Sequence, residues 1–127
     1  MSSPCRILCI DDHRDSAEML QMLLRDESHT VVVANSISEA LELVKREEFD
    51  LYVLDRRLPD GTGIELCLRL AEVSPNVPCI FYTGDAYEVH REQALAAGAE
   101  HYISKPNIET LIATITKVLA DRECATA

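Results

Sequence analysis

Aromatic residues are scarce in this sequence, which has no tryptophan, two phenylalanines and four tyrosines. Hydrophobic residues still make up 47% of its 127 residues, so a folded core must be mostly aliphatic. A chain of this length has the size of one domain and buries roughly two-thirds of the surface that its unfolded form exposes, so it needs neither a metal ion nor a disulfide to hold a core. We expect one domain over residues 1–127, with its core over about 5–121 and a frayed tail over 122–127.

Positive charge is also in short supply. The sequence has 12 basic residues against 22 acidic ones, which gives a formal net charge of -10. An electrostatic field of this sign repels nucleic acids and anionic membrane surfaces. We therefore expect no direct contact of this chain with nucleic acid or with a membrane, although a domain attached to it could behave differently.

Long apolar runs and paired cysteines are missing as well. The N-terminal stretch MSSPCRILCIDDHRD has a short apolar run that two aspartates interrupt, so it is neither a signal peptide nor a membrane span. The five cysteines (Cys5, Cys9, Cys67, Cys79 and Cys124) contain no CxxC pair. Cys5 and Cys9 would lie roughly 13 Å apart on an extended strand, too far for a disulfide. We expect all five to be small buried groups in a reducing compartment, the cytoplasm.

Five short apolar runs alternate with longer amphipathic stretches. The runs cover residues 6–10, 30–34, 51–54, 78–82 and 101–104, and helical periodicity predicts helices over 14–27, 64–73, 86–97 and 107–119. Ser36 and Glu39 form a capping-box pattern at the start of a further helix. Because neighbouring parallel strands need crossover connections, this alternation predicts a parallel sheet with helices on both faces.

Polar side chains follow four of the five predicted strands. They are Asp11 and Asp12, Asp55, Thr83 with Gly84 after it, and Lys105. In an open α/β sheet, sites form at the carboxyl ends of the strands. An acidic residue after a strand is usually a turn former, but that role does not explain Thr83 or Lys105. We therefore expect these strand ends to meet in one site.

Three carboxylates at one edge of a sheet repel one another, so Asp11, Asp12 and Asp55 need compensating charge. Lys105 offsets one charge and a divalent cation offsets the rest, and oxygen ligands favour Mg²⁺ over zinc. A carboxylate beside a cation, a hydroxyl and an ammonium group is suited to phosphoryl transfer through an acyl phosphate. The histidines lack the spacing of metal ligands, and we expect each to be solvated or structural: His13, His29, His90 and His101.

With these residues in this order, the sequence resembles the receiver domain of two-component response regulators along essentially its whole length. The matching pieces are CIDDH, LDRRLPDGTG, FYTGD and HYISKP. The resemblance implies an α/β fold, the flavodoxin-like (βα)5 three-layer sandwich, with a five-stranded parallel sheet of order 2-1-3-4-5. It also implies a signalling module that is no enzyme toward other substrates and catalyses only its own aspartyl phosphorylation and dephosphorylation.

The resemblance further implies roles for the carboxylates. Asp55 would be the phosphoacceptor, taking a phosphoryl group from the phosphohistidine of a sensor histidine kinase or of a histidine phosphotransfer protein. Asp12 would bind Mg²⁺ directly, with Mn²⁺ as an alternative ion. Asp11 would bind the ion mainly through water, and Arg57 through its backbone carbonyl.

The resemblance also implies a switch. Thr83 and Lys105 would bind the phosphoryl oxygens, together with the backbone amides of Arg56 and Gly84. Phosphorylation would draw the Thr83 hydroxyl inward, so that Tyr102, at the aromatic switch position of the family, rotates into the vacated space. This rotation would alter the surface of the fourth helix, fifth strand and fifth helix, which would bind an effector protein or fused domain, or a second copy in a homodimer.

Three positions near the site need separate comment. The bond between Lys105 and Pro106 matches a peptide bond that is usually cis in the family. Asn107 stands where the family often has Phe, and we expect it to cap the last helix. The Arg57 side chain is not needed for the metal, and we hypothesise that it pairs with Asp85 across the mouth of the site and restricts the hydrolytic water. The alternative is an exposed arginine in solvent.

Two other functions compete with the main prediction. A pseudo-receiver would bind partners without being phosphorylated, but every residue that phosphorylation requires is present. A hydrolase of the haloacid dehalogenase type also uses an aspartyl nucleophile and Mg²⁺. Such enzymes have the nucleophile after their first strand, in a D-x-D arrangement. In this chain the first strand is followed by two adjacent aspartates, Asp11 and Asp12. The sequence given stops soon after the last predicted helix, 107–119, so we expect either a single-domain regulator or a piece of a longer regulator or hybrid kinase.

Overall fold

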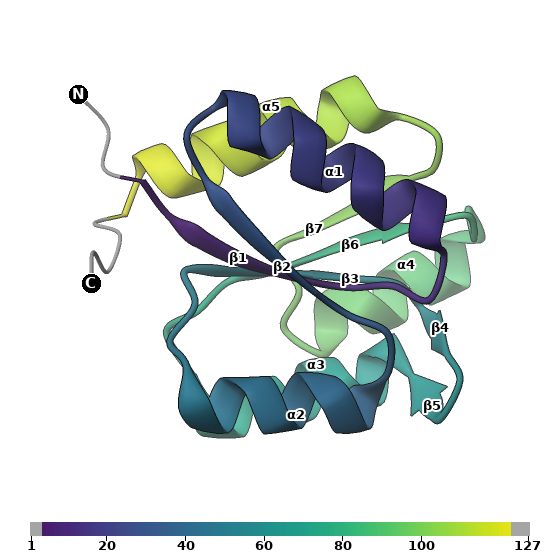
Figure 1. Cartoon of the computed structure of the whole chain (residues 1–127). Coiled ribbons are helices and arrows are strands. Elements are labelled where there is room, and N and C mark those ends of the chain that lie inside the picture. The colour runs from purple at the N-terminus through teal and green to yellow at the C-terminus, as the bar shows by residue number, and fades with distance from the viewer. Residues whose placement is uncertain (1–3, 123–127) are drawn as a thin grey trace.

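The structure is a computed structural model that describes residues 4–122. Its main sheet has five parallel strands in the order β2-β1-β3-β6-β7 (Figure 1). These are β1 (Arg6–Ile10), β2 (Thr30–Ala34), β3 (Leu51–Leu54), β6 (Cys79–Thr83) and β7 (His101–Ser104). Counted along the chain, the order is 2-1-3-4-5, so the predicted flavodoxin-like topology is confirmed. Most of the expected tail, residues 123–127, lies outside the described residues.

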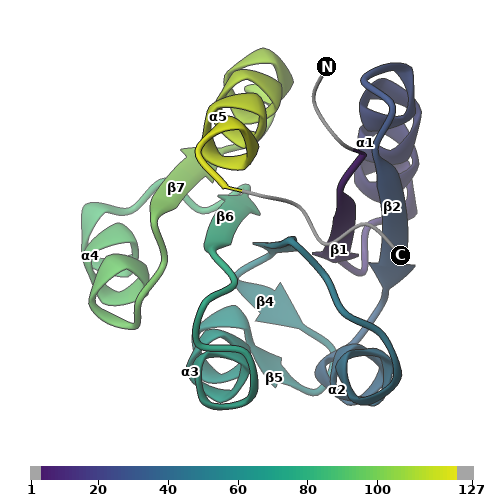
Figure 2. The same cartoon turned by 90° about the vertical axis from the view of Figure 1, so that its left-hand side faces the viewer.

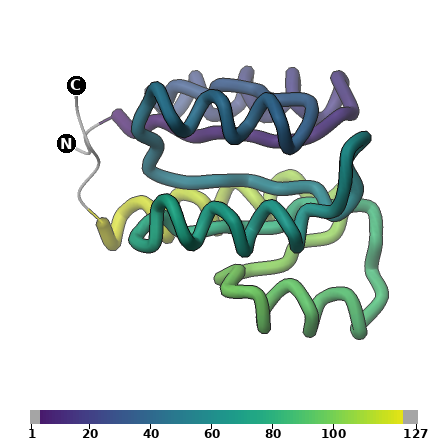
Figure 3. The backbone as a smooth tube through the Cα atoms, turned by 90° about the horizontal axis from the view of Figure 1, so that it is seen from below, coloured from purple at the N-terminus to yellow at the C-terminus, as the bar shows by residue number. Residues whose placement is uncertain are grey.

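Within residues 4–122, five helices cover the two faces of this sheet. They are α1 (Arg14–Asp26), α2 (Ile37–Arg46), α3 (Gly63–Val73), α4 (Glu88–Ala96) and α5 (Ile108–Ala120). Helices α1 and α5 lie on one face, whereas α2, α3 and α4 lie side by side on the other (Figures 1, 2 and 3). Because β3 and β6 are covered from both sides, every residue of these two strands is buried. None of the described helices is both long and apolar enough to cross a bilayer.

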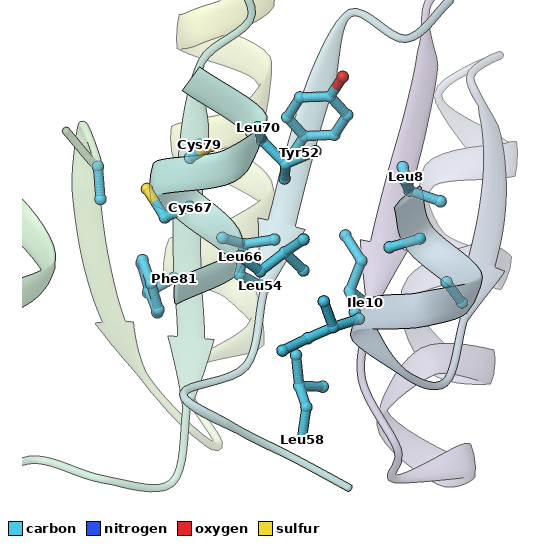
Figure 4. Close-up of a cluster of buried hydrophobic side chains, with 14 of the residues drawn as sticks. Leu8, Ile10, Tyr52, Leu54, Leu58, Leu66, Cys67, Leu70, Cys79 and Phe81 are labelled. Atoms are coloured by element: carbon cyan, nitrogen blue, oxygen red, sulfur yellow. The ribbon is translucent and has the colours of Figure 1, made fainter. Parts of the chain in front are cut away.

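Two hydrophobic cores lie on opposite faces of the sheet. In β1, Leu8 and Ile10 point into the core beneath α2, α3 and α4, whereas Ile7 and Cys9 point into the core beneath α1 and α5. This alternation is the ordinary side-chain period of a strand. Figure 4 shows part of the first core, which is mostly aliphatic, as predicted, with a few aromatic side chains such as Tyr52.

A short antiparallel hairpin follows β3, and the sequence did not predict it. Its strands are β4 (Arg57–Leu58) and β5 (Gly61–Thr62). Asp60 at its turn accepts hydrogen bonds from the first two backbone amides of α2, at 2.9 and 3.0 Å. These bonds hold the pKa of Asp60 below its ordinary value. The hairpin therefore caps α2 together with Ser36, whose hydroxyl accepts from the Glu39 amide at 3.1 Å, as the capping-box pattern predicts.

Two local predictions need correction. Asn107 occupies the N-cap position of α5, as expected, but its side chain makes no capping hydrogen bond. Cys5 is buried, as expected, but it takes part in a disulfide, so the prediction of a free thiol there is wrong. The spacing along an extended strand excluded only a bond between Cys5 and Cys9. The other described cysteines are buried free thiols: Cys9, Cys67 and Cys79.

Candidate functional site

The carboxyl ends of β1, β3, β6 and β7 meet at one edge of the sheet. Ile10 pairs with Leu54, and Thr83 pairs with Ser104, so the residues that follow these strands leave the sheet side by side. This edge gathers the polar residues that the sequence places at strand ends: Asp11, Asp12, Asp55, Thr83 and Lys105. Asp11, Asp55 and Thr83 are 3%, 4% and 3% exposed, so these polar groups need partners inside the protein.

Asp55 follows β3 directly and has partners on both carboxylate oxygens. The Arg56 amide donates to its Oδ1 at 2.7 Å, and Lys105 Nζ donates to its Oδ2 at 3.3 Å. Burial by itself raises the pKa of Asp55, but a hydrogen bond from Thr83 and the charge of Lys105 outweigh it, so the pKa lies below its ordinary value. Asp55 is therefore an ionised carboxylate at neutral pH.

Lys105 connects two of the carboxylates. Its Nζ donates to Asp11 Oδ2 at 2.8 Å as well as to Asp55, and it lies 5.7 Å from the centre of the Tyr82 ring. Burial alone would lower the pKa of Lys105, but the hydrogen bond to Asp11 and the charges of Asp11 and Asp55 raise it. The lysine is held as a cation against the two aspartates, and the peptide bond after it, to Pro106, is cis.

His13 is part of the same cluster, which the sequence analysis did not predict. Its Nδ1 lies 3.0 Å from Asp11 Oδ1, 3.3 Å from Asp12 Oδ1 and 3.4 Å from Asp55 Oδ2. The hydrogen bond to Asp11 raises the pKa of His13. A signal was available, because His13 comes directly after Asp12 at the end of β1. The spacing between histidines carries no such signal, whereas the spacing between His13 and the strand-end aspartates does.

These residues have the donor chemistry of a divalent cation site. One ligand atom from each of Asp11, Asp12, His13 and Asp55 lies within 4.8 Å of the others, and two of the four side chains are buried. Carboxylate oxygens are the preferred ligands of Mg²⁺, so the acidic cluster fits that ion. The buried Asp11 and Asp55, each bonded to Lys105, need further positive charge to offset the third carboxylate.

The remaining expected contributors lie close to the cluster in sequence or in space. Gly84 follows β6 at an open position, where an added Cβ would meet no atom within 4 Å. Arg57 begins β4 with its side chain exposed, two residues beyond Asp55. The Arg56 amide is the one that contacts the Asp55 carboxylate.

Asp85 pairs with a different arginine from the one that we expected. Its Oδ2 lies 3.4 Å from Nη1 of Arg56 and 2.6 Å from Nδ1 of His90, whereas no ion pair of Arg57 is found among residues 4–122. Burial would raise the pKa of Asp85, but a hydrogen bond from the Tyr87 amide and the partner His90 lower it. The hypothesis of a lid formed by Arg57 and Asp85 is therefore wrong in its choice of arginine.

Tyr102 lies half-buried beside this network. Its hydroxyl donates to the Asp85 carbonyl at 2.7 Å, and its ring stacks on Phe81 with the centroids 5.8 Å apart. Burial, with the charge of Asp85, raises the pKa of Tyr102 to about 12, so the hydroxyl keeps its proton and remains a donor. Tyr102 is thus tied to the loop that follows Thr83.

Comparison with known proteins points to one family. The model of the family described as response regulator receiver domain matches residues 7–116. The response regulator MprA of Mycobacterium leprae is 36% identical over 115 residues, which cover 90% of this chain and 50% of that protein. A CheY-like receiver domain protein of Methanospirillum hungatei has a TM-score of 0.87 and 32% identity, over 94% of this chain and 96% of that one.

A structure of the BeF3-activated DrrB receiver domain is also similar, with a TM-score of 0.86 and 27% identity, over 93% of this chain and 99% of that one. The curated relatives are longer. The chain spans about half the length of the first three that it matches, namely 43%, 50% and 50%. The likeness therefore concerns one part of those relatives.

Proposed function

Because the chain belongs to the response regulator receiver domain family, we propose that Asp55 accepts a phosphoryl group in a two-component or phosphorelay pathway. One observation carries this proposal: the Asp55 carboxylate lies buried at the end of β3, 3.3 Å from Lys105 Nζ and within the cluster that it forms with Asp11 and Asp12. A carboxylate so placed is the expected nucleophile of acyl phosphate chemistry.

The transfer itself is a displacement at phosphorus. An oxygen of ionised Asp55 attacks the phosphorus of a phosphohistidine; the P–O bond forms as the P–N bond breaks, and the histidine nitrogen leaves with the electron pair. The low pKa of Asp55 keeps that oxygen unprotonated at neutral pH. The domain thus promotes only its own phosphorylation and the later hydrolysis of its acyl phosphate.

The phosphoryl oxygens would find hydrogen-bond donors around Asp55. Lys105 already contacts the carboxylate and would turn its ammonium group to the incoming oxygens, and the Thr83 hydroxyl, which bonds to Asp55, would do the same. The backbone amides of Arg56 and Gly84 complete the set. Donors fixed in this way stabilise charge as it develops on the transferring group.

A divalent cation, Mg²⁺ or Mn²⁺, would neutralise charge on the transferring phosphoryl group when bound. Asp12 and Asp55 would hold it directly and Asp11 mainly through water, with the backbone carbonyl of Arg57 as a further ligand. Their convergence within 4.8 Å supports this assignment for the three aspartates.

The output would pass through Thr83 and Tyr102. If the Thr83 hydroxyl moves toward the phosphoryl group, Tyr102 can turn into the space that it leaves, which breaks the hydrogen bond from Tyr102 to the Asp85 carbonyl. This change would reach the surface formed by α4, β7 and α5. We assign to that surface the contacts with an effector protein or fused domain, and a homodimer of the phosphorylated form.

We further propose that the phosphoryl donor is a sensor histidine kinase or a histidine phosphotransfer protein, and that the chain acts as one receiver domain in the cytoplasm. The buried free thiols of Cys9, Cys67 and Cys79 suit a reducing compartment, whereas the disulfide at Cys5 does not. The family assignment leaves no support for a hydrolase of the haloacid dehalogenase type. A pseudo-receiver is disfavoured by the presence of Asp55 with all its expected partners.

Phosphorylation of the purified chain by acetyl phosphate with Mg²⁺ tests the proposal. The intact mass of the wild-type protein should increase by one phosphoryl group, and beryllofluoride with Mg²⁺ should change its tyrosine fluorescence. Asp55→Asn should abolish both responses, whereas the matched control Asp15→Asn, at an exposed position of α1, should keep them. An unresponsive wild type, or an Asp55→Asn variant that still responds, would contradict phosphorylation at Asp55 and favour the pseudo-receiver.

A further inference from the structure

We propose that His13 is a ligand of the cation held by Asp11, Asp12 and Asp55, and that its imidazole makes the site prefer a first-row transition ion, such as Co²⁺ or Ni²⁺, to Mg²⁺. This role rests on the cation site of the proposed function and adds a ligand to it. In this role, His13 sets which divalent ion the site binds most tightly.

The distances within the cluster are those between neighbouring ligands of one ion. Two ligand atoms at about 2.1 Å from an ion and at right angles to each other lie about 3.0 Å apart. His13 Nδ1 is 3.0 Å from an oxygen of Asp11, 3.3 Å from one of Asp12 and 3.4 Å from one of Asp55. The nitrogen therefore needs only small movements to share an ion with all three carboxylates.

The backbone directs this ring toward the aspartates. His13 is the N-cap residue of α1, but its side chain makes no capping hydrogen bond to the helix. Its amide donates to Asp11 Oδ1 at 2.8 Å, which fixes the main chain of His13 beside that carboxylate. The side chain is 66% exposed, so the ring covers the solvent side of the cluster and can turn to admit an ion.

The added donor changes which ion binds best. An all-oxygen site suits Mg²⁺, which keeps several waters and binds nitrogen poorly. An imidazole nitrogen suits the later divalent ions, and affinity rises from Mn²⁺ through Co²⁺ to Ni²⁺. A site of three carboxylates and one imidazole should therefore bind Co²⁺ and Ni²⁺ more tightly than it binds Mg²⁺, with His13 responsible for much of the difference.

A purely electrostatic role for His13 makes the opposite prediction. If the ring only balances the aspartates and is expelled when an ion enters, its removal should tighten the binding of every divalent ion by a similar factor. If the ring is a ligand, its removal should weaken Co²⁺ and Ni²⁺ selectively. The ratio of the affinity for Co²⁺ or Ni²⁺ to the affinity for Mg²⁺ therefore distinguishes a ligand from a purely electrostatic role.

Calorimetric titration with MgCl₂, CoCl₂ and NiCl₂ at pH 8 measures this ratio. We compare the wild type with His13→Ala and His13→Asn, the latter keeping a good N-cap side chain, and with the matched control His101→Ala, an exposed histidine on β7. Loss of His13 should weaken Co²⁺ and Ni²⁺ on the order of tenfold and leave Mg²⁺ within about twofold. The visible absorption of bound Co²⁺ should change in both His13 variants and not in His101→Ala.

Asp12→Asn tests whether both ions bind at this site, since the loss of the carboxylate should weaken the binding of Mg²⁺ and the binding of Ni²⁺ alike. Binding of Mg²⁺ and Ni²⁺ that changes by the same factor in the His13 variants, or Ni²⁺ binding that Asp12→Asn leaves intact, would overturn the proposal. Far-UV circular dichroism of each variant serves to check that it is folded. Phosphorylation of Asp55 is scored separately with acetyl phosphate, so a selective His13 effect without phosphorylation would count against the proposed function and not against the role of His13.

Discussion

Two adjacent arginines follow Asp55, and they have different surroundings. Arg56 Nη1 lies 3.4 Å from Asp85 Oδ2, and the two side chains are 17% and 18% exposed. Arg57 begins β4 and is exposed. Successive side chains of an extended segment leave the backbone on opposite sides, so only one of the two arginines can reach the loop after β6. Arg56 is the one that does, and its ion pair with Asp85 connects the loop after β3 to the loop before α4.

This difference can be measured by removing each arginine in turn. Arg56→Ala should lower the free energy of unfolding by about 1 kcal/mol, because it takes a partner from the partly buried Asp85 carboxylate. Arg57→Ala is the matched control and should change it by less than about 0.5 kcal/mol. Urea unfolding of both variants gives the comparison, and equal losses would show that the pair of Arg56 and Asp85 does not stabilise the fold.

At the scale of the elements, the first turn of α3 packs directly against the backbone of Asp55. The Gly63 amide donates to the Arg56 carbonyl at 2.7 Å. A Cβ on Gly63 would lie 2.0 Å from the Asp55 carbonyl oxygen and 2.8 Å from the Phe81 ring. Glycine is therefore required here by close approach, and α3 sets the position of the residue that we assign as phosphoacceptor.

Gly63→Ala should separate the start of α3 from β3. We expect a loss of about 1–3 kcal/mol in the free energy of unfolding, as is usual for overpacking, and slower phosphorylation of Asp55 by acetyl phosphate because its backbone must shift. Gly84→Ala is the control for stability, since a Cβ there meets no atom within 4 Å. Thermal unfolding of both variants measures the two losses of stability. Similar losses in Gly63→Ala and Gly84→Ala would contradict the close packing of Gly63 as the cause.

At the scale of the whole molecule, one sheet serves two cores. Neighbouring side chains of β1 enter opposite cores, so the two cores share the strands of one sheet. The described part of the chain should therefore unfold as a single cooperative unit, as small domains usually do.

One cavity in each core tests this cooperativity. Leu66→Ala, on the buried side of α3, and Leu111→Ala, on the buried side of α5, should each cost about 2–5 kcal/mol in the free energy of unfolding, because both leucines are fully buried. Leu68→Ala, at a position on α3 that is 51% exposed, should cost less than about 0.5 kcal/mol. Circular dichroism and tyrosine fluorescence should report one transition for every variant; separate transitions would mean that the cores unfold independently.

Much of the fold follows from local patterns. The five apolar runs are strands within one residue of their predicted bounds, because a run of four or five largely apolar residues between amphipathic stretches is typical of a strand in a sheet that helices cover. The hairpin after β3 was missed, since each of its strands has only two residues and carries no periodic signal. Its Asp60 caps a helix that lies before it in the chain, which no local pattern can reveal.

The parallel sheet could be predicted from the sequence alone, because apolar runs alternate with amphipathic stretches along the chain. The same holds for the gathering of five polar residues, since the carboxyl ends of parallel strands share one edge: Asp11, Asp12, Asp55, Thr83 and Lys105. The directions in which the loop side chains leave that edge could be seen only in the folded chain. His13 turns back to the aspartates, and Arg56 rather than Arg57 meets Asp85. These directions depend on packing between residues far apart in the chain, whereas strand order and strand ends follow from alternation along it.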